Sequence, residues 1–199
     1  MTVHRLLHDR SAASAAEFAL VLPLMILMLF GIIDAGRFAW EYNRAEKATS
    51  EGARVAVVTD VISTGLATQD YVGVGGLTQG DLIPASALSP VTCTRASCTC
   101  TGSCPTGYAT ANATSFDRIV ARMNLMKGDI AAANVQVKYS GSGLGYAGDP
   151  NGMEISPLVT VSLTGLRFRP LILFTTTTLP MPDFSTTLTA EDSVGVQSN

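Results

Sequence analysis

Histidine and charge are both scarce in this sequence, and their scarcity excludes several classes of function. Of the 199 residues only 15% are charged, and the two histidines, His4 and His8, lie near the N-terminus. Since no histidine follows residue 8, the rest of the chain has no imidazole that could act as a general base or bind a metal ion. The sequence contains no Gly-x-Ser-x-Gly motif, P-loop or dinucleotide-binding fingerprint. We therefore predict that the protein is not an enzyme, and we expect no cofactor.

The sequence also lacks a long basic run, which argues against a nucleic-acid partner. The formal net charge is −3, and electrostatic attraction to phosphates is the main source of nonspecific nucleic-acid binding. The polar residues are mostly threonine, serine and glycine. This composition favours an exposed domain that is rich in β-structure over a helical cytosolic protein.

One long hydrophobic run stands out near the N-terminus. Residues 18–33 (FALVLPLMILMLFGII) carry no formal charge, and from Ala12 to Ile33 only Glu17 is charged. About 20 apolar residues span a bilayer, whereas a cleaved signal peptide has a core of about 7–15. We predict a retained single span with membrane lipid as a partner. Small residues within 34–40 leave cleavage by signal peptidase as an alternative.

The orientation of this span is expected to place the N-terminus in the cytoplasm. Basic residues occur on both sides of the run, so the positive-inside rule gives little guidance. The first ten residues are too short to form a domain, however, and the clustered cysteines suit an oxidising compartment. The larger C-terminal part is therefore the part we expect to be exported.

Glu17 needs an explanation because a carboxylate close to lipid is energetically costly. One interpretation places this side chain at the level of the lipid head groups, where it simply marks the start of the span. The other interpretation pairs it with a positive group of a neighbouring chain.

Three short segments carry a resemblance to a known family. Residues 17–23 (EFALVLP), 30–37 (FGIIDAGR) and 51–54 (EGAR) resemble the TadE-like family, the type IV pilin-like pseudopilins of the Tad/Flp pilus system. The resemblance covers about residues 12–58 and is loose beyond them. It implies that a prepilin peptidase cuts between Ala12 and Ala13, so that Glu17 becomes the fifth residue of the mature chain.

The same resemblance implies a function in pilus assembly. We expect a minor pseudopilin that takes part in assembly or initiation through helix–helix packing, with Glu17 and Phe18 in subunit assembly. The helix motif comprises Glu51, Gly52, Ala53 and Arg54. The implied partners are other pilins and pseudopilins, the prepilin peptidase and the inner-membrane assembly platform. The alternative is an uncleaved, membrane-anchored envelope or adhesion protein, which is favoured by Ala12 in place of a family glycine and by the Thr-rich domain.

The sequence divides into a leader (1–12), a transmembrane and pilin-like helix (13–58) and an extracytoplasmic α+β domain (59–199). Small residues recur at spacings of three and four through residues 35–56, which predicts that the helix continues. This small-residue stripe either covers the protein's own domain or lets helices of neighbouring subunits approach closely.

The distal domain is predicted to be a small antiparallel sheet with a packed helix. Residues 59–90 read as loop with at most short strands, and residues 112–127 as a helix capped by Thr114 or Ser115 and ended by Gly128. Alternation predicts strands, joined in part by a turn-rich connection, at residues 135–139, 157–163 and 184–190. Residues 169–174 have no assignment.

The four cysteines, Cys93, Cys98, Cys100 and Cys104, form one cluster. Their spacing lacks the paired C-x-x-C of a zinc ribbon, so we predict disulfides and no metal site. A Cys98–Cys100 bond would close a very small ring. Two pairings remain open, Cys93–Cys98 with Cys100–Cys104, and Cys93–Cys100 with Cys98–Cys104.

Overall fold

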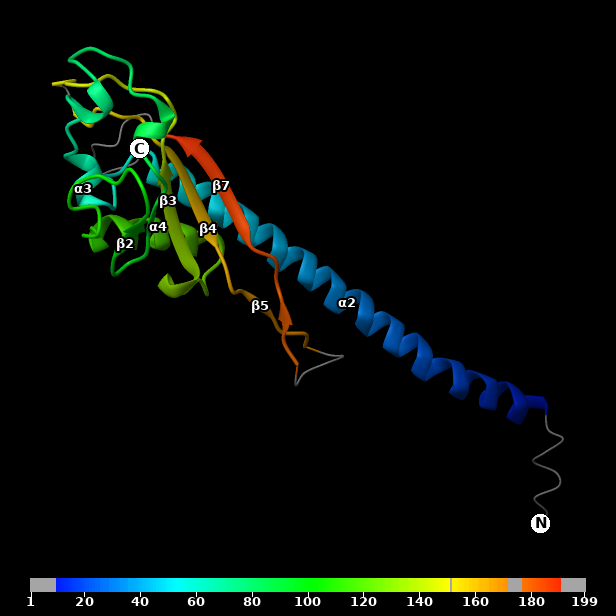
Figure 1. Ribbon diagram of the computed structural model, residues 1–199. Helices are drawn as coiled ribbons and strands as arrows, with labels where there is room; N and C mark the ends of the chain where they lie inside the picture. The colour runs from blue at the N-terminus through cyan, green and yellow to red at the C-terminus, as the bar shows by residue number, and fades with distance from the viewer. Residues whose placement is uncertain (1–9, 151, 172–176, 191–199) are drawn as a thin grey trace. The chain divides into compact units, whose positions relative to one another are not determined.

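The computed structural model describes residues 10–150, 152–171 and 177–190 (Figure 1). The chain forms two compact units. The first comprises Met1–Glu41 and Arg167–Pro180, and the second, which we call the head, comprises Tyr42–Leu166 and Met181–Asn199. The combination of a long apolar helix with a small antiparallel sheet and a packed helix confirms the predicted α+β class.

The first helix, α2 (Arg10–Ala56), is 47 residues long. At 1.5 Å per residue it extends over about 70 Å. Pro23 lies inside it and cannot donate to the carbonyl of Ala19, which is a loss that transmembrane helices tolerate. The continuous helix confirms that the small-residue pattern of residues 35–56 extends the apolar run in helical form.

A two-stranded hairpin completes the first unit. Strand β5 (Arg167–Phe168) pairs antiparallel with β6 (Leu179–Pro180), with Arg167 opposite Pro180 and Phe168 opposite Leu179. The stretch 169–174 that the sequence left unassigned follows β5 directly. Its first three residues belong to the described chain, and residues 172–174 lie outside it.

The head is built on a five-stranded antiparallel sheet in the order β2-β1-β3-β4-β7. Its long strands are β3 (Val135–Ser140), β4 (Leu158–Leu163) and β7 (Phe184–Thr189), which confirm the three predicted strands to within one residue at every end. Alternate residues of β3 are buried. The period-2 pattern was therefore a reliable signal because one face of the sheet packs on the core.

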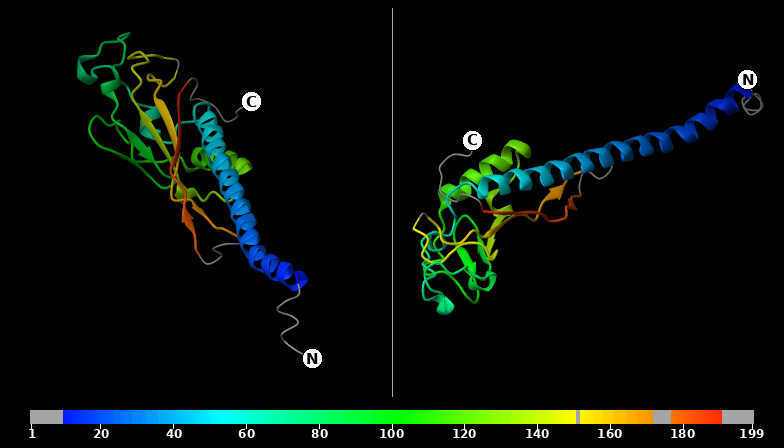
Figure 2. Two further views of the ribbon diagram at one scale, coloured as in Figure 1. Left: turned by 90° about the vertical axis from the view of Figure 1, so that its right-hand side faces the viewer. Right: turned by 90° about the horizontal axis from the view of Figure 1, so that it is seen from above.

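Helix α4 (Ala113–Met126) covers the sheet together with the last turns of α2 (Figure 2). A Cβ atom on Gly52 of α2 would lie 2.8 Å from Met123 Cγ of α4 and 3.3 Å from Val161 Cγ1 of β4. The three elements thus meet at this glycine. Phe116, Ile119 and Met123 of α4 are fully buried.

The predicted ends of α4 need correction. Asn112 is the N-cap, not Thr114 or Ser115, because its Oδ1 accepts the backbone N–H groups of both Thr114 (3.1 Å) and Ser115 (3.2 Å). A side-chain oxygen at this position satisfies donors that the first turn leaves unpaired. The helix ends at Met126, and Lys127 is the C-cap, one residue before Gly128.

Two strands and several short helices were not predicted. Strands β1 (Val91–Cys93) and β2 (Cys98–Cys100) have three residues each, which is too short for alternation to distinguish them from loop. The expected loop 59–90 contains α3 (Thr64–Ala67), η1 (Val74–Gly76) and η2 (Ala85–Ala87) in place of strands. A further short helix, η3 (Ala132–Asn134), precedes β3.

Candidate functional site

The N-terminal part of α2 presents an apolar surface that nothing in its own unit covers. Every residue from Ser14 to Leu29 is exposed. The exposed large apolar side chains between residues 18 and 33 are Phe18, Leu20, Val21, Leu22, Leu24, Met25, Ile26, Leu27, Met28, Leu29, Ile32 and Ile33. Burying a side chain of this size stabilises by about 1.5–3 kcal/mol, so half a dozen of them represent on the order of 10 kcal/mol. This surface, residues 18–33, is called the apolar segment below.

The apolar segment has the length and composition of a membrane span. Among the described residues α2 is the one helix long and apolar enough to cross a bilayer, and its most apolar window contains no buried residue. A core helix of similar composition would be covered by its own fold. The chain therefore has the features of a single-span, membrane-anchored protein.

Glu17 and Phe18 lie at the start of the apolar segment, and both side chains are exposed. Within the described part of the chain, Glu17 makes no hydrogen bond or ion pair. Ala12 and Ala13 lie in the first turn of α2. Cleavage between these two alanines and an assembly role for Glu17 and Phe18 stay predictions.

Asp34 ends the apolar segment, and sequence reasoning gave it no role. It is only 7% exposed, and its Oδ1 accepts the Leu171 N–H at 3.1 Å and lies 3.4 Å from Arg37 Nη1. Phe38 packs edge-on against Phe168 with a centroid distance of 5.3 Å. These contacts hold the β5–β6 hairpin on α2 directly after the apolar segment. The signal in the sequence was a carboxylate immediately after a long apolar run.

The Glu51–Arg54 motif belongs to the head and lies near the C-terminal end of α2. Glu51 pairs with Arg122 of α4 at 3.2 Å and with Arg54 at 3.7 Å. Gly52 is buried where a side chain would collide with Met123, and Ala53 is fully buried. In this structure the motif serves helix–helix and helix–sheet packing within one subunit.

The small-residue stripe is buried in one part and exposed in the other. Ala45, Ala48, Gly52, Ala53 and Ala56 are buried in the head. For this part of α2 the simpler interpretation, a helix that covers its own domain, is correct. Ala35 and Ala39, in the first unit, are exposed.

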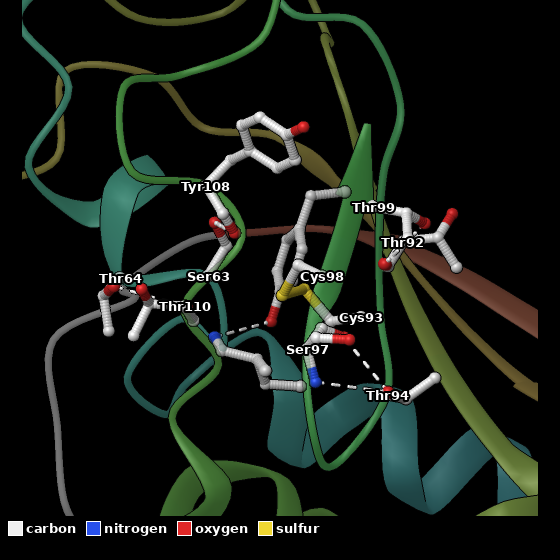
Figure 3. The surroundings of a disulfide bond; sticks show 12 residues. Ser63, Thr64, Thr92, Cys93, Thr94, Ser97, Cys98, Thr99, Tyr108 and Thr110 are labelled. Carbon is white, nitrogen blue, oxygen red and sulfur yellow. Dashed lines mark hydrogen bonds between the residues drawn. A yellow bond between two sulfur atoms is a disulfide. The ribbon is translucent and has the colours of Figure 1, made fainter. Parts of the chain in front are cut away.

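The cysteines form two disulfides, Cys93–Cys98 and Cys100–Cys104, which is one of the two pairings that the sequence left open. Cys93 and Cys98 are directly opposite each other on β1 and β2, as Figure 3 shows. Thr94 closes the turn between them, since both its N–H and its hydroxyl donate to the Ser97 carbonyl at 2.9 and 3.0 Å. The first bond ties β1 to β2, and the second ties the end of β2 to the loop that follows it, in a region with few apolar side chains of its own.

The head contains two buried tyrosines, Tyr71 and Tyr139, whose hydroxyl groups differ in their hydrogen bonding. The Tyr139 hydroxyl accepts the Ile62 N–H at 3.1 Å, and burial raises the pKa of Tyr139 despite this bond, which lowers it. Burial, and then the charge of Glu154, raises the pKa of Tyr71 to about 12. Within the described chain the Tyr71 hydroxyl has no hydrogen-bond partner. Neither group is placed to act as an acid or base near neutral pH.

No metal centre is evident in the part of the chain that the structure describes. There, no three His, Cys, Asp or Glu side chains come close enough together to hold an ion. The exposed pair of Arg95 and Asp117 joins the β1–β2 turn to α4 through two bonds of 2.7 and 2.8 Å. Arg95 lowers the pKa of the Asp117 carboxyl through these hydrogen bonds. The pair therefore links the turn, which carries the cation, to the helix, which carries the anion.

Comparison with known proteins bears directly on α2. Residues 12–54 match the TadE-like protein family. The match covers Ala12, Ala13, Glu17, the apolar segment and the Glu51–Arg54 motif, and it confirms the resemblance drawn from the sequence. No curated protein and no solved structure matches the chain. The match covers less than a quarter of the chain, and the similarity it shows is that of α2 to TadE-like proteins.

Proposed function

We propose that this protein is a minor pseudopilin of a Tad/Flp-type pilus that takes part in assembly or initiation through helix–helix packing. One span would anchor it in the bacterial inner membrane, with the C-terminal domain periplasmic or extracellular. The observation that carries the proposal is the coincidence of the TadE-like match with a helix whose apolar residues are exposed throughout residues 18–29. A helix of this kind is stable in lipid or among similar helices, but not in water.

The proposed subunit contact uses one side of the apolar segment. Side chains on this side are spaced by three and four residues and line a shallow groove: Phe18, Leu22, Met25, Ile26, Met28, Leu29 and Ile32. An apolar side chain of a neighbouring pilin helix fits such a groove as a knob fits a hole. Lipid tails cover the same side chains before assembly, so the exchange of lipid for protein has no large hydrophobic cost.

Glu17 would give this contact its register. If the prepilin peptidase cuts between Ala12 and Ala13, each mature subunit carries a free α-amine four residues before its carboxylate. In a staggered bundle the amine of one subunit can approach the Glu17 carboxylate of the next. A buried charge without a partner is strongly destabilising, whereas a complementary pair is tolerated. The pair therefore favours one stagger over others more than it adds stability.

The test replaces Glu17 with alanine in the full-length protein in its own host. We expect normal membrane insertion and normal disulfide formation in the head, but loss of the subunit from sheared pili or from complexes with other pilins. Glu46→Ala is the matched control, because Glu46 is also exposed on α2 but lies in the head. Glu17→Asp should restore part of the assembly, since it keeps the charge.

Normal pilus formation by Glu17→Ala would contradict the role given to this carboxylate. N-terminal sequencing of the membrane-extracted protein tests the cleavage step. A mature chain that begins at Ala13 supports the proposal, and one that begins at Met1 favours the uncleaved envelope or adhesion protein. Pull-down with pilins, the prepilin peptidase and the assembly platform then tests the partners.

A further inference from the structure

The β5–β6 hairpin is fixed to α2 at the helical turn that follows the apolar segment. Asp34 accepts the Leu171 N–H, and the Phe38 ring packs edge-on against Phe168. The Arg37 guanidinium lies 5.5 Å from the centre of the Phe168 ring, within the range of a cation–π contact. The hairpin therefore lies at the level of α2 where apolar residues give way to charged ones.

The exposed side chains of this hairpin are apolar and cationic, and Leu179, directly opposite Phe168, lies on the other face from Arg167 and Leu171. Residues 167–171 alternate between exposed and buried, with Phe168 and Pro170 buried. Leu171 is 62% exposed and Leu179 of β6 is 48% exposed. Arg167 and Arg169 are exposed on the same face as Leu171, and Arg167 donates to Thr178 Oγ1 at 3.3 Å.

This combination matches the boundary between lipid head groups and acyl chains. Leucine side chains enter the outer part of the acyl region, while arginine side chains reach up to phosphate oxygens. The apolar segment, if it spans the bilayer, brings the hairpin to this boundary because Asp34 and Phe38 follow the segment directly. The positive charges of Arg37 and Arg167 complement the negative charge of anionic head groups.

We propose that the β5–β6 hairpin is a second membrane contact, which inserts Leu171 and Leu179 into the lipid interface and holds Arg167 against lipid phosphates. The occupant of this surface is thus a lipid bilayer that contains anionic lipid. The inference rests on the proposed anchoring of the chain by α2. A hairpin that is bound both to the helix and to the interface restricts rotation and tilt of the span about its exit point.

Depth-dependent fluorescence quenching tests this placement. The chain has one tryptophan, and Trp40 is 65% exposed, so Trp40→Phe gives a background without tryptophan. Three probes are then introduced singly into the full-length protein: Leu171→Trp in the hairpin, Leu27→Trp in the apolar segment and Leu125→Trp on the outer side of α4, where Leu125 is 69% exposed. Each is reconstituted in vesicles of phosphatidylcholine and phosphatidylglycerol with or without brominated acyl chains.

We expect the Leu171→Trp probe to be blue-shifted and quenched about twofold by lipids brominated near the head group, as for a side chain about 5–10 Å into the interface. The Leu27→Trp probe should be quenched most by lipids brominated deeper in the chain, and the Leu125→Trp probe should not be quenched. Vesicles of phosphatidylcholine alone should weaken quenching at the hairpin but not in the apolar segment.

The probes separate failure of this inference from failure of the proposed function. Quenching of Leu27→Trp without quenching of Leu171→Trp would overturn the inference and leave the anchoring intact. If Leu27→Trp is not quenched either, the anchoring itself is wrong. A Leu171→Trp probe that is shielded from both brominated lipid and aqueous acrylamide would show that protein, not lipid, covers the hairpin, which also contradicts the inference.

Discussion

Two parts of the same helix use small and apolar residues for different purposes. In residues 18–33 of α2 the large apolar side chains are exposed, whereas in residues 45–56 the small ones are buried among α4 and the sheet. Composition distinguishes them only partly, since both parts are poor in charge on the face concerned. What differs is the partner. The head provides its own core, whereas no residue of its own unit covers the apolar segment, and we propose that lipid or other subunits cover it.

The largest expected effect comes from placing charge in the apolar segment. The double substitution Leu24→Arg and Leu27→Arg should remove the protein from the membrane fraction, because each arginine near the centre of a span costs about 2.5–3.5 kcal/mol. After purification and reoxidation in vitro the head should still form both disulfides and keep its thermal midpoint, because a chain that fails to insert stays in the reducing cytoplasm. Leu125→Arg, at an exposed position of α4, is the control and should change neither property. Loss of head folding in the double variant would contradict the independence of the two parts.

Two glycines of α2, Gly36 and Gly52, have different surroundings. Gly52→Leu should destabilise the head by about 3 kcal/mol, at the upper end of the usual cost of overpacking, because its Cβ would meet Met123 Cγ at 2.8 Å. Gly36→Leu should leave the free energy of unfolding unchanged, because no atom lies within 4 Å of a Cβ there. Urea titration followed by near-ultraviolet circular dichroism in micelles measures both. Equal effects would show that the two glycines have equivalent surroundings.

The hydroxyl groups of the two buried tyrosines should contribute differently to the stability of the head. Tyr139→Phe leaves the buried Ile62 N–H without its acceptor, which should cost about 1–3 kcal/mol of folding free energy. Tyr71→Phe removes a hydroxyl that has no partner among the described residues and should be close to neutral at pH 7. Thermal unfolding of the two variants side by side would be decisive, and a larger loss for Tyr71→Phe would contradict the assignment.

Alkaline pH should affect the head and spare the span. The pKa of Tyr71 is raised to about 12 by burial and by Glu154, and a free tyrosine titrates at about 10. Because folding favours the neutral phenol, its contribution to stability is complete below about pH 10 and is lost as the pH rises through 12. The unfolding free energy of the head should therefore fall in this window, and less steeply in Tyr71→Phe. Insertion should not change, since residues 18–33 contain no titratable side chain.

The long strands and helices could be predicted from the sequence because each buries one face, and burial of one face gives a regular spacing of apolar residues. In β3 buried and exposed residues alternate, in β4 Val159, Val161 and Leu163 are buried, and α4 carries an apolar stripe that is buried. Three-residue strands such as β1 are too short to give such a pattern. The N-cap of α4 was misplaced because Thr114 and Ser115 are also good capping residues, and only the backbone geometry selects Asn112.

The candidate site was predictable only in part. The apolar segment and Glu17 could be identified from composition alone. The contact of Asp34 with Leu171 joins residues 137 positions apart, and that of Ile62 with Tyr139 joins residues 77 apart. No local pattern encodes such pairings. The sequence also could not show that Gly52 packs against residues of its own subunit, since a small residue on a helix suits any close neighbour.

Extraction of intact membranes with alkaline carbonate, followed by mass spectrometry of the protein, shows whether lipid covers the apolar segment of α2. We predict that the protein stays in the membrane pellet and that its mature sequence still contains residues 18–33. Recovery of the intact chain in the supernatant, with residues 18–33 present, would contradict the proposed membrane anchoring by α2.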